Sequence, residues 1–177
     1  MLCTNTMHLV APRIEAAVSI PFLHIADAAG AAAVEAGTLT VGLLGTAFTM
    51  EQDFLKSRLA AQGLTVLVPE ADERQAVHRI IYEELCVGVI SDASRKVYQG
   101  VIESLAARGA QAIILGCTEI SLLIKPEQAF HVAADLDQHV ARLILRVDRD
   151  LRHDPAQSFD CGSIEGFVEA TQHAPQR

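Results

Sequence analysis

The chain has 177 residues, of which 50% are hydrophobic and only 5% aromatic, and its formal net charge is −8 at pH 7. Because the chain is acidic and has no Lys/Arg block, nucleic acid and anionic membrane surfaces are poor candidate partners. No apolar stretch reaches the roughly 18 residues of a membrane span and no signal-peptide pattern is present, so we expect a cytoplasmic protein. The abundance of Ala and aliphatic residues suits parallel strands covered by helices.

The four cysteines are Cys3, Cys86, Cys117 and Cys161, and they form no Cys-x-x-Cys pair. No Cys/His cluster has the spacing of a zinc site, so we expect reduced thiols and no metal. The glycines of VGLLGT (residues 41–46) lack the Gly-x-Gly start of a dinucleotide fingerprint, and no phosphate-binding loop is present.

The N-terminal part predicts few elements. Residues 8–18 have the pattern of a helix, and the short apolar run at residues 21–26 (PFLHIA) predicts a strand. A sheet cannot be built from one strand, so this part predicts an incomplete lobe.

The next region alternates strands and helices. Apolar runs bounded by Gly or polar residues predict three buried parallel strands, at residues 39–44, 64–68 and 112–115. Helical spacing of apolar residues predicts a helix over residues 49–62, ended by Gly63, and a pair of helices before the third strand, ended by Gly109. This order predicts a doubly wound α/β lobe with right-handed crossovers.

Further elements are predicted beyond the third strand. Residues 130–133 predict a fourth strand and residues 136–147 a final helix. From about residue 149 the periodicity is lost, which predicts a loosely ordered tail with a short helix over residues 164–171.

Cys117 follows the third predicted strand in AIILGCTEI (residues 112–120). Gly116 allows a sharp turn there, and Cys117 then lies at the carboxyl end of a parallel strand, where α/β proteins bind ligands. Cys117 or Thr118 could cap the next helix, whose dipole would lower the pKa of the thiol. We therefore predict that Cys117 is a catalytic thiol; the alternative is a buried, inert Cys.

The N-terminus repeats this pattern in MLCTNTMH (residues 1–8), where a Cys-Thr pair again precedes a predicted helix. Asn5 and Thr6 could hydrogen-bond a carboxylate or simply cap that helix. Two such turns facing each other would place small acid/base groups on opposite sides of a substrate. Moving a proton from one face of a carbon to the other requires that arrangement.

LCTNTMH, the GLLGT strand and GCTEI together resemble the Asp/Glu/hydantoin racemase superfamily, most closely its aspartate/glutamate branch. GTAFTM and IYEEL belong to the same pattern, and the resemblance covers residues 1 to about 148. It implies a cofactor-independent amino-acid racemase that acts on an acidic amino acid. It also implies two pseudo-symmetric α/β lobes, each a parallel sheet flanked by helices, with the site between them, and commonly a homodimer.

Members of this superfamily have a further strand-helix unit before the CTNTMH turn, so the first lobe is expected to be incomplete here. Residues 1–37 plus 134–148 would be its remnant, residues 38–133 the second α/β lobe, and residues 149–177 a tail. The strand edges and helix faces left uncovered predict self-association and low activity.

The resemblance implies that Thr4 and Cys117 are the facing catalytic residues, because Thr4, next to Cys3, occupies the register of the first cysteine of two-cysteine members. A hydroxyl is a weaker base than a thiolate, so proton removal would fall to Cys117. Cys86, where some members have a Lys, is predicted to be a core residue. The expected substrate contacts are Asn5, Thr6, Thr46, Thr49, Thr118 and Glu119.

Two other functions also fit the sequence. A cysteine hydrolase would pair Cys117 with His8 or His139 and would release product from an activated ester in a burst. A non-catalytic remnant of a racemase would bind its ligand without exchanging the α-proton.

Overall fold

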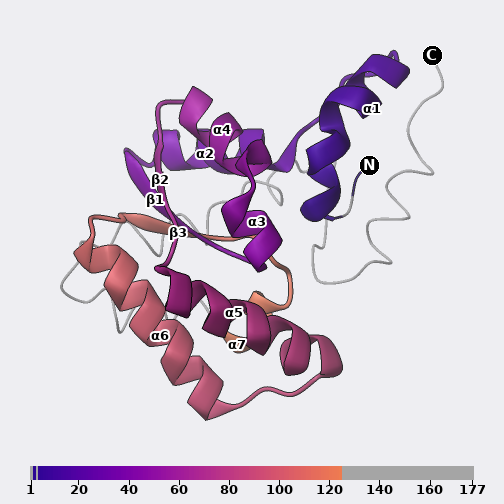
Figure 1. Ribbon diagram of the computed structural model, residues 1–177. Helices are drawn as coiled ribbons and strands as arrows, with labels where there is room; N and C mark the ends of the chain where they lie inside the picture. Colours follow the sequence, from indigo (N-terminus) through magenta and orange to yellow (C-terminus); the bar gives the residue numbers. More distant parts are fainter. Residues whose placement is uncertain (1, 3, 125–177) are drawn as a thin grey trace, which may run out of the picture.

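A three-stranded parallel sheet forms the centre of the computed structural model, which describes residue 2 and residues 4–124 (Figure 1). Its strands, in spatial order, are β2 (Thr65–Leu67), β1 (Thr40–Leu44) and β3 (Ala112–Leu115). Val41 of β1 pairs with Val66 on one side and with Ala112 on the other. All three strands predicted from apolar runs are confirmed, with no end shifted by more than one residue.

Two helices, α2 (Ile25–Glu35) and α4 (Asp53–Ala61), cover one face of the sheet. Ala33 of α2, Leu59 of α4 and Val41 of β1 are buried in one core cluster. The small side chains of the alanines in α2 let its backbone approach the sheet and α4 closely.

The other face carries α5 (Ala71–Glu83) and α6 (Asp92–Ala107), which Figure 1 shows on the opposite side of the sheet from α2 and α4. A short 3-10 helix, η2 (Leu85–Val87), lies between them. Tyr98 and Ile113 are buried in the larger core cluster on this side. This confirms the helix pair predicted between the second and third strands.

Glycines end two of these helices as predicted. Gly63 and Gly109 follow α4 and α6 with φ of 87° and 100°, a left-handed conformation that favours glycine. The single helix predicted over residues 49–62 is instead two helices, α3 (Ala47–Glu51) and α4, because Gln52 between them is extended.

The N-terminal segment forms the 3-10 helix η1 (Thr6–Val10) followed directly by α1 (Ala11–Ala17), in agreement with the predicted helix. The strand predicted at residues 21–26 is wrong: α2 begins at Ile25, and the residues before it have no regular structure. The side chain of His24 caps α2 by accepting a hydrogen bond from the backbone of Ala26, and an Ala-rich sequence of high helix propensity follows.

The assignment of residues 1–37 to a first lobe stays a prediction, although α2, which lies in that range, shares a core with the sheet. The strand, helix and tail predicted after residue 129 lie outside the described residues. Within the described part of the chain, no helix is both long and apolar enough to cross a membrane.

Candidate active site

A hydrogen bond joins the two turns that the sequence singled out. The side-chain amide of Asn5 donates to the carbonyl oxygen of Gly116 over 2.8 Å, although the two residues are 111 positions apart. Gly116 follows β3, and its own N–H donates to the carbonyl of Leu44 at the end of β1 over 2.6 Å. The two turns therefore meet at the carboxyl ends of the two neighbouring strands, the edge of the sheet predicted to carry the site.

Gly116 has no room for a side chain. A Cβ atom there would lie 2.9 Å from the carbonyl oxygen of Leu44 and 3.2 Å from the methyl group of Thr49. The turn before Cys117 can pass this closely over the end of β1 only because the residue is glycine.

The Cys117 thiol is half-buried and donates a hydrogen bond to the Glu119 carboxylate over 2.9 Å. The hydroxyl of Thr118 donates to the same carboxylate oxygen over 3.0 Å. Burial, together with the hydrogen bond to Glu119 and its charge, raises the pKa of Cys117 to about 12. The thiol's hydrogen bond is in turn the main cause that lowers the pKa of Glu119. At neutral pH the pair is thus a neutral thiol beside a carboxylate.

This geometry corrects the expectation that a helix dipole lowers the pKa of Cys117. The helix that follows, α7 (Ile120–Leu123), is a single turn, and its N-cap is Glu119 rather than Cys117 or Thr118. So short a helix contributes little field, and burial dominates.

Thr46 and Thr49, at the start of α3, lie next to the turn that carries Cys117. Thr46 caps α3 by accepting the N–H of Thr49 over 3.3 Å, and their hydroxyl oxygens lie 3.1 Å apart. Thr49 is buried, and its methyl group lies 3.1 Å and 3.2 Å from the positions that Cβ atoms on Gly45 and Gly116 would take. Both threonines are therefore beside the Cys117 turn, but their hydroxyl groups are already used within α3.

Thr4 and Thr6 are exposed at the N-terminal turn, which the Asn5 bond holds against Gly116. Thr6 begins η1. Cys3 lies outside the described residues. Cys86 lies in η2 and is exposed, so the prediction that it packs in the core is wrong.

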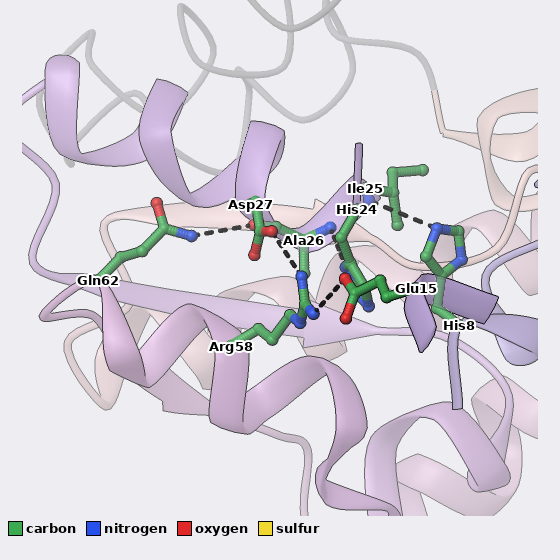
Figure 2. A network of polar contacts seen from close by, with 8 residues as sticks. All are labelled: His8, Glu15, His24, Ile25, Ala26, Asp27, Arg58 and Gln62. Atoms are coloured by element: carbon green, nitrogen blue, oxygen red, sulfur yellow. Dashed lines mark hydrogen bonds and ion pairs between the residues drawn. The ribbon is translucent and has the colours of Figure 1, made fainter. Parts of the chain in front are cut away.

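Two buried histidines, His8 and His24, lie side by side next to the N-terminal turn (Figure 2). This contact was not predicted from the sequence. His8 Nδ1 lies 2.9 Å from the carbonyl oxygen of Thr4, and His8 Nε2 lies 3.4 Å from the backbone nitrogen of Ile25. The rings of His8 and His24 meet edge to face, 4.4 Å apart. The four-residue spacing between Thr4 and His8, one helical turn, was the only signal of this contact in the sequence.

An ionic cluster fastens the same segment to the lobe. Arg58 of α4 binds Asp27 of α2 over 2.6 Å and Glu15 of α1 over 2.9 Å (Figure 2). These groups are all partly exposed, so each pair contributes modestly, but one guanidinium links three helices.

A cavity of about 200 Å³ lies behind the Asn5–Gly116 contact, between the sheet and α2 and α4. Asn5 contributes the only polar side chain among its described lining residues. The remaining lining is aliphatic, so the cavity does not provide the charged groups that an acidic amino acid needs. Nor do residue 2 and residues 4–124 contain a cluster of three or more His, Cys, Asp or Glu side chains suited to a metal ion.

Comparison with known proteins gives a consistent result. The sequence model of the family described as Asp/Glu/hydantoin racemase matches residues 1–137. The chain is 46% identical to a candidate Asp/Glu racemase from Yersinia pestis, over 84% of this chain, with a TM-score of 0.70. It is 31% identical to an aspartate racemase homologue from Pyrococcus horikoshii OT3, over 82% of this chain, with a TM-score of 0.64. An aspartate racemase from Picrophilus torridus, 19% identical over 79% of this chain, shares the fold with a TM-score of 0.54.

The chain therefore belongs to the Asp/Glu/hydantoin racemase family, as its paired turn motifs predicted. Its α/β fold is that of these racemases. The alignment spans 64% of the length of each of the three solved structures, so the fold seen here is incomplete relative to theirs.

Proposed function

We propose that this chain is a cofactor-independent racemase of an acidic amino acid, in which Cys117 and Thr4 exchange the α-proton from opposite faces. The observation that carries the proposal is the hydrogen bond from Asn5 to Gly116, which holds the two turns together. The family membership and the racemases it resembles support the reaction class, and their names support an acidic substrate.

The Cys117–Glu119 pair defines the proton state from which such a reaction would start. A thiol with a pKa of about 12 is protonated at neutral pH and is ready to donate a proton to a carbanion. To remove a proton it must first lose its own, and the resulting thiolate is then a stronger base than an ordinary one. The raised pKa of Cys117 and the lowered pKa of Glu119 both oppose transfer of that proton to the Glu119 carboxylate, whose role is to accept the thiol's hydrogen bond.

The opposite face would be served by Thr4. Its hydroxyl is a poor base, so Thr4 would deliver or relay a proton, and the two directions of the reaction should differ in rate. Asn5 and Thr6 of the N-terminal turn and Thr118 beside Cys117 would stabilise the substrate's carboxylate in the carbanion. The Thr118 hydroxyl would first have to leave the Glu119 carboxylate. Thr46 and Thr49 would act mainly by holding the shape of the Cys117 turn beside them.

A cysteine hydrolase receives less support. The bonded partner of Cys117 is a carboxylate rather than an imidazole, and both ring nitrogens of His8 face backbone groups. His139 lies outside the described residues. A non-catalytic remnant would bind aspartate or glutamate without exchanging the α-proton, and the heavy-water assay distinguishes it from a racemase. A homodimer and a cytoplasmic location stay predictions.

The proposal is tested by proton exchange. The purified chain is incubated with L- and D-aspartate, and separately with L- and D-glutamate, in heavy water, and loss of the α-proton and change of chirality are followed. We expect exchange that Cys117→Ser reduces by at least about 100-fold, the scale of a lost general acid/base. Cys86→Ser, at an exposed thiol, is the matched control and should keep the parental rate.

Three outcomes would count against the proposal. Equal rates for Cys117→Ser and the parent chain would remove Cys117 from the reaction. Binding of aspartate or glutamate without exchange would identify a non-catalytic chain. Burst release of product from an activated ester would favour the hydrolase.

A further inference from the structure

His8 has a defined protonation state because of its two backbone partners. The Thr4 carbonyl oxygen near Nδ1 can only accept a hydrogen bond, and the Ile25 N–H near Nε2 can only donate one. Both bonds exist together only if Nδ1 carries the proton and Nε2 carries a lone pair. The imidazole is therefore neutral and in a single tautomer.

The surroundings of His8 hold its ring in place. His8 is 3% exposed and packs against the rings of His24 and Phe22, at 4.4 Å and 5.9 Å. Burial and the charge of Arg58 lower the pKa of His24, while Asp27 and Glu15 oppose this effect. The neighbouring ring is thus uncharged as well at neutral pH.

The two bonds of His8 connect the N-terminal turn to a helix that packs on the sheet. Ile25 is the first residue of α2, which packs on the sheet. Thr4 is exposed and precedes Asn5, whose side chain reaches Gly116. The imidazole therefore bridges the backbone of the exposed turn to the first residue of α2.

We infer that His8 is a positioning residue: its Nδ1–H holds the Thr4 carbonyl and thereby sets the direction of the Thr4 hydroxyl toward the substrate. This inference rests on the proposed racemase function. Loss of the bond should leave the Cys117–Glu119 pair unchanged, because His8 and that pair share no hydrogen bond. The defect would then appear in the step that Thr4 serves, so that inversion of configuration falls more than exchange of the α-proton.

Three variants separate this role from simple packing. In His8→Asn the amide can still donate to Thr4; in His8→Gln the longer side chain can still accept from Ile25; His8→Phe keeps an aromatic ring and makes neither bond. We expect His8→Gln and His8→Phe to lower the ratio of inversion to exchange by about tenfold, the factor that one hydrogen bond is worth. In His8→Asn the ratio of inversion to exchange should remain within about threefold of the parent. This order should hold even if the melting temperatures of the three variants follow a different order.

Nitrogen-15 NMR of the unaltered chain tests the inference without relying on activity. We expect one protonated Nδ1 and one unprotonated Nε2 for His8 at pH 7.5, and a Thr4 carbonyl carbon shift that changes in His8→Phe but not in His8→Asn. An Nε2–H tautomer or an imidazolium would overturn the inference. So would an inversion ratio that follows melting temperature across the three variants. If the parent chain exchanges no proton while the NMR result holds, the racemase proposal fails and the positioning of Thr4 stands.

Discussion

Adding one methyl group at Gly116 should disturb both the fold and the site. In Gly116→Ala the new Cβ would lie 2.9 Å from the carbonyl oxygen of Leu44, and this oxygen belongs to β1 and cannot swing aside as a side chain would. It would also press on side chains of Leu43 and Thr49 at 3.2 Å. Overpacking of this kind costs about 1–3 kcal/mol. A loss of about 2 kcal/mol lowers the melting temperature of a chain of this size by about 4–8 °C.

The matched control is Gly100→Ala. Gly100 lies inside α6, and apart from the adjacent residues and the helix's own backbone no atom is within 4 Å of the Cβ that the substitution adds. Alanine should therefore raise stability there by about 0.5–1 kcal/mol, because glycine loses more backbone entropy in a helix. Thermal unfolding followed by circular dichroism gives both values, and the exchange assay gives activity. If both variants shift the melting temperature in the same direction, the close contact between Gly116 and Leu44 does not determine the stability of this turn.

Two further predictions concern the chemistry and the assembly of the site. Because the pKa of Cys117 is raised to about 12, its alkylation by iodoacetamide, followed by peptide mass spectrometry, should be slow at pH 8, and Glu119→Gln should speed it by removing the charge that opposes the thiolate. Fast alkylation of Cys117 at pH 8 would contradict the raised pKa. Because the raised pKa keeps the thiol protonated in the folded state, its contribution to the free energy of unfolding is complete below about pH 9 and is lost as the pH rises toward 12. Asn5→Ala should lower the free energy of unfolding in urea by about 1 kcal/mol and reduce exchange, since it removes the bond to Gly116; unchanged values for both would show that the two turns do not depend on each other.

The sequence was informative wherever a local pattern determines the structure. Buried parallel strands are continuous apolar runs, so β1, β2 and β3 could be predicted from sequence, and Gly63 and Gly109 marked helix ends because they take positive φ. PFLHIA was ambiguous, because a short apolar run does not distinguish a strand from the approach to a helix. The cap made by His24 decides between them, and it depends on side-chain direction.

The site followed the same rule. The paired motifs placed Cys117 at a strand end, and the structure brings the N-terminal turn to it through Asn5. The raised pKa of Cys117 could not be predicted, because it depends on burial and on how the Glu119 side chain folds back. The contact between His8 and Thr4 fits their spacing of one helical turn. The second partner of His8, Ile25, depends on how α2 packs and has no signal in the sequence.

The span of the Asn5–Gly116 bond also bears on how the molecule folds. The bond closes a loop of more than a hundred residues that contains all three strands, whereas only the short connection through α3 and α4 separates β1 from β2. Closing a long loop costs only slightly more entropy than closing a short one, but contacts between distant residues form after local ones. We expect the sheet and its helices to assemble first and the two turns to meet last. Partial opening at the N-terminal segment would then dismantle the site while leaving the sheet intact.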